Sequence, residues 1–311
     1  MLFHRKLNSA KSALFAEFVF YKFQHFLLLL QGMKRLYLLI CIILLNLGLL
    51  AQTSTDSIVV YDRNGQQVGF EEMLAATAGK KYIMFGELHG NPLAHQSELL
   101  LLQYLHQQHG SRLLLGMEMF EADVQPIVDE YFSGLINQRS FETEARVWGN
   151  YAKDYKPLVE YARENKLRLI ASNVPRRYAN SVYHQGVQVL NNMSKEAKGN
   201  FAKLPLKIDW ELESYKAMAS MLPDHSAENF IASQALKDAT MGQNINKNVK
   251  KNDVLLHVHG AYHSINGEGI VPYIKGLRNE QLLLITTIQQ EEGKAIDPTV
   301  FAKADFTIVS P

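Results

Sequence analysis

The sequence predicts an α/β fold with three layers, α/β/α, in which a mainly parallel sheet carries a helical insertion. Short apolar runs alternate with segments of helical spacing, and this alternation is typical of a sheet with helices on both sides. Several runs are apolar from end to end, as strands covered on both faces are. The predicted strands comprise residues 57–61, 82–85, 112–117, 168–171, 254–258, 282–287 and 306–309.

The first fifty residues differ in composition from the rest of the chain. Met33 is followed by two basic residues, an apolar run at 36–50 and then small and polar residues. This order predicts a signal peptide at residues 33–51, because the run is shorter than the ~20 residues of a usual transmembrane helix. A retained membrane anchor is the alternative. We expect residues 1–32 to be a mis-annotated N-terminal extension and residues 52–311 to be a single exported domain, periplasmic or envelope-associated.

Composition and motifs exclude several classes of protein. Charged residues make up 20% of the chain and its formal net charge is +1, so we expect no nucleic-acid partner. The single cysteine, Cys41, lies in the apolar run and follows Ile40, where a lipoprotein signal requires a small residue. Cleavage would leave no thiol, which excludes disulfides, thiolate ligands and covalent haem attachment. The sequence has no motif for nucleotide binding, serine hydrolysis or zincin proteolysis.

The clearest predicted helix begins at Pro92. Asn91 is a capping residue, proline suits the first helical position, and Gly110 is typical of a helix end. His95 lies in the first turn on a stripe with Leu99 that faces the core. We therefore expect His95 near the strand end that precedes the helix.

Residues 178–251 predict a long helical insertion over the edge of the sheet. Within it, Gln234 and Asp238 share one stripe with apolar residues such as Ile231 and Met241. Because an unpaired buried polar group costs about 1–3 kcal/mol, we expect both to have partners at the site or between helices.

Four predicted strands run into polar residues where each strand ends. The segments are GELHG (86–90), GMEMFE (116–121), SNVPRR (172–177) and HVHGAYH (257–263). In open α/β sheets, ligands bind beyond the carboxyl ends of the strands. The four segments therefore predict one shared site.

The first segment, together with the first turn of the helix after it, offers a carboxylate and two imidazoles. Glu87 and His89 are two residues apart, so they point to one side of an extended strand, and His95 follows after a tight turn. This set suits a divalent metal, a proton-transfer pair, or hydrogen bonding and axial ligation of haem. The alternative is that Glu87 and His89 only cap the following helix.

The next two segments carry an acid and two cations. Glu118 ends an apolar strand, so it is either paired, for example with Arg176 or Arg177, or kept neutral by a raised pKa. Asn173 precedes a proline that opens a helix, and the two arginines in its first turn predict a seat for carboxylates or phosphates. The alternative for the arginines is that they are solvated surface charges.

The last segment contains three histidines in seven residues. His257 and His259 share a face of an extended strand, and His263 follows after a turn. Such a set can present ligands to a metal, and packed core histidines are the alternative. Gly267 and Gly269, further on, are predicted turn glycines.

A series of motifs follows in a fixed order along residues 80–275. They are GELHGNPLAHQ (86–96), EMFEADVQ (118–125), Trp148, YKPL (155–158), ARENKLRLIASNVPRR (162–177), SQALKDATM (233–241) and HVHGAYHSINGEGIVP (257–272). Together they resemble the ChaN-like haem-binding uptake proteins, which belong to a wider group with the Tiki, TraB and erythromycin esterase proteins. Members are often lipoproteins, whereas this chain lacks the small residue that a lipoprotein signal requires before its cysteine. The histidine of the family pattern in the last segment corresponds to His263, and not to His257 or His259.

The resemblance implies an exported protein that binds haem non-covalently for haem and iron uptake. It further implies a homodimer, since one member encloses two stacked haems between two subunits, and an outer-membrane haem receptor as a partner. Without thiols, the iron ligand is expected to be one of His89, His95, His263 and Tyr155, with His257 and His259 as weaker candidates. The residues expected to contact haem are Glu87, His89, His95, Glu118, Tyr155, Asn173, Arg176, Arg177, Gln234 and His263, with an arginine at the propionates.

A metal-dependent hydrolase is the alternative function. In that case Glu87, His89, Glu118 and His263 would hold a divalent ion or activate water, because a bound metal lowers the pKa of water towards ~7. Glu118 discriminates between the two functions. Contact with a metal or water favours the hydrolase, and pairing with arginine alone favours a binding pocket.

Overall fold

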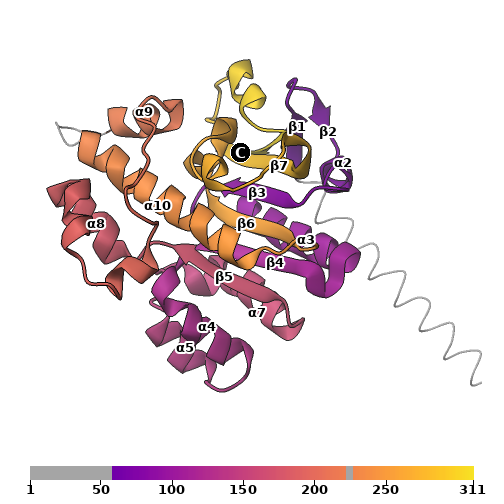
Figure 1. The fold of residues 1–311 in the computed structure, drawn as a ribbon. Coiled ribbons are helices and arrows are strands. Elements are labelled where there is room, and N and C mark those ends of the chain that lie inside the picture. Colours follow the sequence, from indigo (N-terminus) through magenta and orange to yellow (C-terminus); the bar gives the residue numbers. More distant parts are fainter. Residues whose placement is uncertain (1–57, 222–226) are drawn as a thin grey trace, which may run out of the picture. The chain divides into compact units, whose positions relative to one another are not determined.

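An eight-stranded, mostly parallel sheet forms the centre of the fold, as Figure 1 shows. The strands lie in the order β2-β1-β8-β7-β3-β6-β4-β5. They are β1 (Val59–Asp62), β2 (Gln67–Val68), β3 (Tyr82–Glu87), β4 (Leu113–Glu121), β5 (Arg168–Asn173), β6 (Val254–Gly260), β7 (Leu282–Gln289) and β8 (Phe306–Ser310). Strand β1 is antiparallel to β2 and β8, and the other pairs are parallel. The predicted fold class is confirmed, and only the two-residue β2 was missed, because it is too short to form an apolar run.

The computed structural model describes residues 58–221 and 227–311. By their contacts, residues Ile58–Pro311 form one unit. The predicted N-terminal extension and signal peptide lie outside the described residues. Within the described ranges, no helix is both long and apolar enough to cross a membrane.

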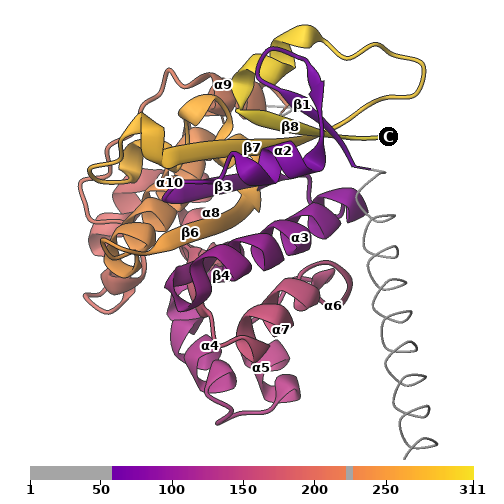
Figure 2. The ribbon, with the colours of Figure 1, turned by 90° about the vertical axis from the view of Figure 1, so that its right-hand side faces the viewer.

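Helices cover both faces of the sheet. The α-helices are α2 (Phe70–Ala75), α3 (Pro92–His109), α4 (Gln125–Phe132), α5 (Gln138–Glu144), α6 (Tyr151–Asp154), α7 (Lys156–Glu164), α8 (Arg176–Gln185), α9 (Glu213–Ser220) and α10 (Ala227–Asn248). The 3-10 helices are η1 (Gly110–Arg112), η2 (Ala122–Val124), η3 (Val187–Asn192), η4 (Ala197–Asn200), η5 (Ala261–His263), η6 (Ile265–Gly267), η7 (Val271–Tyr273), η8 (Asn279–Gln281) and η9 (Pro298–Lys303). Figures 1 and 2 show α10 on one face of the sheet and α3 and α7 on the other.

Two apolar cores lie on the two faces of the sheet, because successive side chains of a strand point to opposite sides. Phe85 of β3 belongs to the core under α3, together with Leu102 of that helix. Its neighbour Met84 belongs to the core under α10, together with Met241 and Ile245. The same alternation decides on which face of the sheet each polar side chain at a strand end lies.

Helix α3 begins and ends where the sequence predicted. The Asn91 side chain accepts hydrogen bonds from the backbone N–H groups of Leu93 and Ala94, both at 3.0 Å. Gly110 follows the helix with φ at 56°, a left-handed conformation that favours glycine. His95 is buried in the first turn. The cap therefore fixes the imidazole close to the end of β3.

The predicted helical insertion consists of α8, α9 and α10. Helix α10 packs along β5 and against α8, so it reaches the carboxyl ends of the strands. Its stripe with Ile231, Gln234, Asp238 and Met241 is buried, as predicted. This helix supplies one wall of the site.

Candidate functional site

The four polar strand ends lie next to one another at one edge of the sheet. Strands β3, β6, β4 and β5 are consecutive and parallel, so their carboxyl ends meet. The turn after β3 carries His89, η5 after β6 carries His263, and α8 begins soon after β5. The prediction that these segments come together is confirmed.

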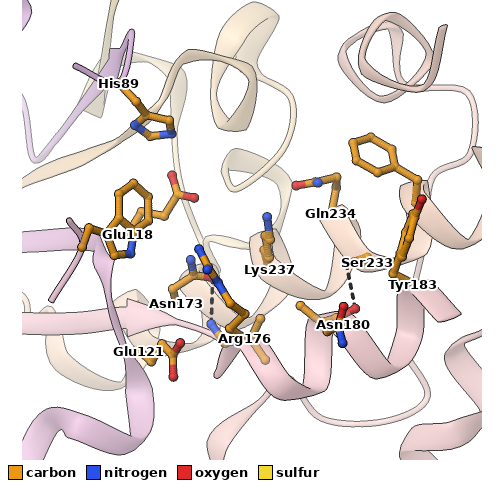
Figure 3. A pocket seen from close by; sticks show the side chains of 14 residues that line it. His89, Glu118, Glu121, Asn173, Arg176, Asn180, Tyr183, Ser233, Gln234 and Lys237 are labelled. Atoms are coloured by element: carbon orange, nitrogen blue, oxygen red, sulfur yellow. Dashed lines mark hydrogen bonds between the residues drawn. The ribbon is translucent and has the colours of Figure 1, made fainter. Parts of the chain in front are cut away.

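A pocket of about 440 Å³ opens between these strand ends and the helices α8 and α10. In Figure 3, His89 and Glu118 lie at one side of it, and Lys237 and Gln234 come from α10. The lining residues are His89, Glu118, Glu121, Trp148, Asn173, Val174, Arg176, Ala179, Asn180, Tyr183, Phe230, Ser233, Gln234 and Lys237. A second pocket of about 920 Å³ shares Glu121, Trp148, Arg176 and Asn180 with the first. The site thus combines aromatic walls with charged groups of both signs.

His89 is oriented by a buried carboxylate. Its Nδ1 lies 2.5 Å from Oε1 of Glu87, and the Tyr155 hydroxyl donates to the same oxygen at 2.6 Å. The edge of the His89 ring meets Trp148 with ring centroids 5.1 Å apart. Burial lowers the pKa of His89, but the hydrogen bond to Glu87 and the charge of Glu118 outweigh it and raise this pKa above its ordinary value. Because Glu87 engages Nδ1, a ligand in the pocket would meet Nε2.

On the α3 side, Glu87 belongs to a buried acidic cluster. Nδ1 of His95 lies 3.2 Å from Oε2 of Glu87 and 3.2 Å from Oε2 of Glu98, and its Nε2 lies 3.7 Å from Asp154. Burial raises the pKa of Glu98 well above its ordinary value, and the charge of Glu87 adds to this. Burial also acts to raise the pKa of Glu87, but hydrogen bonds, first of all from His89, hold it below the ordinary value.

Glu98 and Asp154 were not among the predicted site residues. Glu98 lies three residues after His95 on the buried side of α3, so helical spacing alone could have found it. Asp154 lies in the four-residue helix α6, whose sequence has no pattern that marks the residue as buried. Trp148, Tyr183, Phe230 and Lys237 were also not predicted as pocket residues.

On the α10 side, Glu118 and His263 form a second buried network. Glu118 accepts a hydrogen bond from the Gly260 N–H at 2.8 Å and lies 3.4 Å from Nε2 of His263. His263 Nδ1 lies 2.5 Å from Asp238, whose other oxygen accepts from the Tyr215 hydroxyl at 2.7 Å. Burial lowers the pKa of His263, but Glu118 and Asp238 raise it to about 10. Burial would raise the pKa of Glu118, but the charge of His263 holds it well below the ordinary value.

The arginine partner suggested for Glu118 is wrong. Its partners are His263 and a backbone N–H, because Glu118 points to the α10 side of β4, whereas Arg177 donates to Asp123 at 2.7 Å. Arg176, one residue earlier, lines the first pocket, and both arginines line the second. The charge that stabilises Glu118 is therefore an imidazolium.

His257 and His259 lie in the interior of the fold. Both are fully buried, their Nδ1 atoms are 3.0 Å apart, and Nε2 of His257 lies 3.0 Å from the Ser172 hydroxyl. Burial lowers the pKa of His257 well below its ordinary value and that of His259 to about 3. Gly116 on the neighbouring strand makes room, because a Cβ there would lie 2.5 Å from the His257 ring. The pair shares a face as predicted, but neither ring lines the pocket.

The remaining candidate residues divide into two groups. Asn173 and Gln234 line the pocket, together with the residues named above. Tyr155 is fully buried behind His89, and burial and the neighbouring Glu87 raise its pKa well above the ordinary value. The pocket thus presents the imidazole of His89 and the carboxylate of Glu118, and each of these two groups is backed by a buried network.

Comparisons with known proteins agree on the type of fold. The chain matches, over residues 73–274, a family model described as haem-binding uptake, Tiki superfamily, ChaN. The solved structure of ChaN of Campylobacter jejuni, described as binding haem cofacially, is similar with a TM-score of 0.61 and 18% identity, covering 81% of this chain and 96% of that one. That likeness shows a shared fold.

Two further solved structures are more distantly similar. The erythromycin esterase EreC has 13% identity and a TM-score of 0.45, with 80% of this chain and 82% of that one covered. The toxin effector domain RRSP of Vibrio vulnificus has 14% identity and a TM-score of 0.41, with 78% and 37% covered. No curated protein sequence matches the chain.

Proposed function

Because the chain belongs to the ChaN family of haem-binding uptake proteins in the Tiki superfamily, we propose that it binds haem non-covalently in the pocket beside His89. The observation that supports this proposal most directly is the exposure and the hydrogen bonding of the His89 side chain. Its side chain is 44% exposed, and Glu87 engages Nδ1 at 2.5 Å. A hydrogen-bonded carboxylate of this kind fixes the tautomer and orientation of a metal-binding histidine.

The other lining residues fit the two chemical characters of haem. Trp148, Tyr183 and Phe230 offer aromatic surface to a porphyrin face, and Arg176 and Lys237 offer positive charge to propionates. The volume of about 440 Å³ is typical of a small-molecule site, and the adjoining pocket extends it past Trp148 and Arg176. Bound haem would supply an iron centre for ligation, and the protein would supply the ligand and the charge complement.

Among the candidate iron ligands, His89 fits best. Both nitrogens of His263 face acids, at 2.5 Å from Asp238 and 3.4 Å from Glu118. Tyr155 is buried with its hydroxyl on Glu87, and its raised pKa opposes the phenolate form that would bind iron. His95 is also buried, behind Glu87. We therefore propose Nε2 of His89 as the axial ligand.

His89→Ala is expected to weaken hemin binding by more than about tenfold and to change the Soret band of the complex, because the imidazole ligand is lost. Absorbance titration with hemin measures both. His109→Ala, at the far end of α3, is the matched control and should bind as the wild-type protein does. A wild-type protein that gives no Soret shift would refute haem binding, and an unchanged spectrum in His89→Ala would refute the assigned ligand.

We also propose that the protein is exported and serves haem or iron uptake, with a homodimer as the haem-bound form and an outer-membrane haem receptor as a partner. The signal-like residues 33–51 and the family description support the first part. The Campylobacter protein is described as binding haem cofacially, which is compatible with two chains sharing the ligand. Intact mass of the secreted chain tests export, and sedimentation with and without hemin tests the dimer.

The hydrolase that the sequence left open remains a second candidate, because His89 and Glu118 both line the pocket. Glu118 is ionised and lines the pocket, so it could accept a hydrogen bond from an attacking water and orient it. Glu118→Gln is expected to abolish any ester or peptide hydrolysis, measured on chromogenic substrates, while hemin binding falls less than twofold. Equal loss of both activities would mean that Glu118 only maintains the pocket.

A further inference from the structure

We propose that Glu87, His95 and Glu98 form a buried site for a first-row divalent cation, of the Mn²⁺, Fe²⁺ or Zn²⁺ class, behind the haem pocket. One potential ligand atom from each residue lies within 4.8 Å of the other two. The site is distinct from the haem pocket, because neither His95 nor Glu98 lines that pocket. The proposed cation site does not rest on the proposal that haem binds in the pocket.

The distances between the donor atoms suit such a cation. Metal bonds of about 2.0–2.2 Å to nitrogen and oxygen, in tetrahedral or octahedral geometry, separate neighbouring ligand atoms by about 3.0–3.5 Å. His95 Nδ1 lies 3.2 Å from Oε2 of Glu87 and 3.2 Å from Oε2 of Glu98. One imidazole and two carboxylates favour Mn²⁺, Fe²⁺ or Zn²⁺ over the all-oxygen sites of Mg²⁺ and Ca²⁺.

The second nitrogen of His95 has the environment of a metal ligand. Its Nε2 lies 3.7 Å from Oδ2 of Asp154, and Asn150 donates to that same oxygen at 2.9 Å. Metal-binding histidines usually direct their other N–H towards a carboxylate, which fixes the tautomer. Asp154 is the acid nearest to this nitrogen, beyond hydrogen-bond distance, and Nδ1 on the other side of the ring faces the two glutamates.

The charge of the cluster is not balanced by the protein. Glu87, Glu98 and Asp154 are 1%, 0% and 4% exposed, respectively. In the part of the chain that the structure describes, only histidines make ion pairs with these three acids. Buried carboxylates without a cation are strongly unfavourable, so either a proton or a metal ion compensates them.

Unsatisfied atoms favour the metal ion. Glu87 Oε2 and Glu98 Oε1 are buried and have no hydrogen-bond partner among the described residues. Buried polar atoms are nearly always bonded, and an ion is a recognised reason for an exception. A proton shared between the two glutamates would satisfy one oxygen of each, whereas a cation would also engage Nδ1 of the imidazole, so the metal content of the protein distinguishes the two arrangements.

The test is the metal content of untagged protein purified without added metal. We expect about one equivalent of a first-row metal in the wild-type protein and less than about a tenth of that in Glu98→Gln, measured by inductively coupled plasma mass spectrometry. After chelation, adding Mn²⁺ or Zn²⁺ should raise the melting temperature of the wild-type protein but not that of Glu98→Gln. Glu164→Gln, an exposed glutamate at the end of α7, is the matched control and should keep the metal.

Two further measurements keep the proposal falsifiable. His89→Ala should retain the metal, and Glu98→Gln should bind hemin at least as tightly as the wild-type protein does, so failure of one site is distinguishable from failure of the other. If Glu98→Gln does not fold, Co²⁺ added to the chelated wild-type protein should give visible bands of mixed nitrogen and oxygen ligation. Wild-type protein that takes up neither metal, or a Glu98→Gln variant at least as stable as the wild-type protein, would overturn the site in favour of a shared proton.

Discussion

Asp238→Asn is expected to lower the free energy of unfolding by about 3–5 kcal/mol, because it removes the acid closest to the buried His263 imidazolium and leaves only the more distant Glu118 as its charged partner. Asp238 is fully buried and lies 2.5 Å from Nδ1 of His263, while Tyr215 donates to its second oxygen at 2.7 Å. Asparagine keeps the shape and an acceptor for Tyr215 but loses the charge. Urea denaturation at pH 7 measures the difference.

The pH dependence of the free energy of unfolding shows whether Asp238→Asn acts by removing a charge or by disturbing the packing. The pKa of His263 is about 10 in the folded chain against an ordinary 6.5, so its contribution is complete below 6.5 and is lost as the pH rises from 6.5 to about 10. The wild-type protein should therefore lose stability across that range, and Asp238→Asn should show a flatter profile. Asp209→Asn, at an exposed aspartate, should change stability by less than about 0.5 kcal/mol. Parallel profiles for the wild-type protein and Asp238→Asn would contradict the charge assignment.

Gly269→Ala is expected to be the most damaging glycine substitution in the loop after η5, with a loss of about 3–5 kcal/mol. Gly269 has φ at +60°, and a Cβ there would lie 2.3 Å from the backbone oxygen of His263. Both the left-handed backbone and the overlap with main-chain atoms oppose a side chain, and backbone cannot move aside as a flexible side chain can. Thermal and urea denaturation measure the loss.

Gly267 gives a matched control in the same loop. Its φ is +71°, but a Cβ there has nothing within 4 Å. Gly267→Ala should therefore cost only the backbone strain, about 1 kcal/mol. If the two alanine variants were equally stable, the contact with His263 would not determine the path of the loop.

Most of the fold could be predicted from the sequence because its signals are local. The predicted strands are apolar runs, and α3 is defined by Asn91, Pro92 and Gly110 at its ends. The expectation that Asp238 has partners followed from its place on an otherwise apolar stripe, and His263 and Tyr215 are those partners.

The rest of the site depends on contacts between segments distant in sequence. The alternation of side chains along a strand predicted that His257 and His259 lie on the same face of the sheet. Which of the two faces of the sheet α10 covers depends on the order of the strands. Arg176 and Arg177 are adjacent, and only the position of Asp123 explains why the second pairs there. The same holds for Glu118, whose partners come from β6 and η5.

The two oxygens of Glu87 face different neighbours. Oε1 holds His89 and Tyr155, and Oε2 lies 3.2 Å from His95. A cation that withdraws electron density from this carboxylate would weaken its hydrogen bond to His89 and so lower the basicity of the opposite ring nitrogen. By thermodynamic reciprocity, ligation at that nitrogen would weaken cation binding by the same factor. If haem and the cation both bind as proposed, the shared Glu87 side chain makes them antagonists, and each weakens the binding of the other.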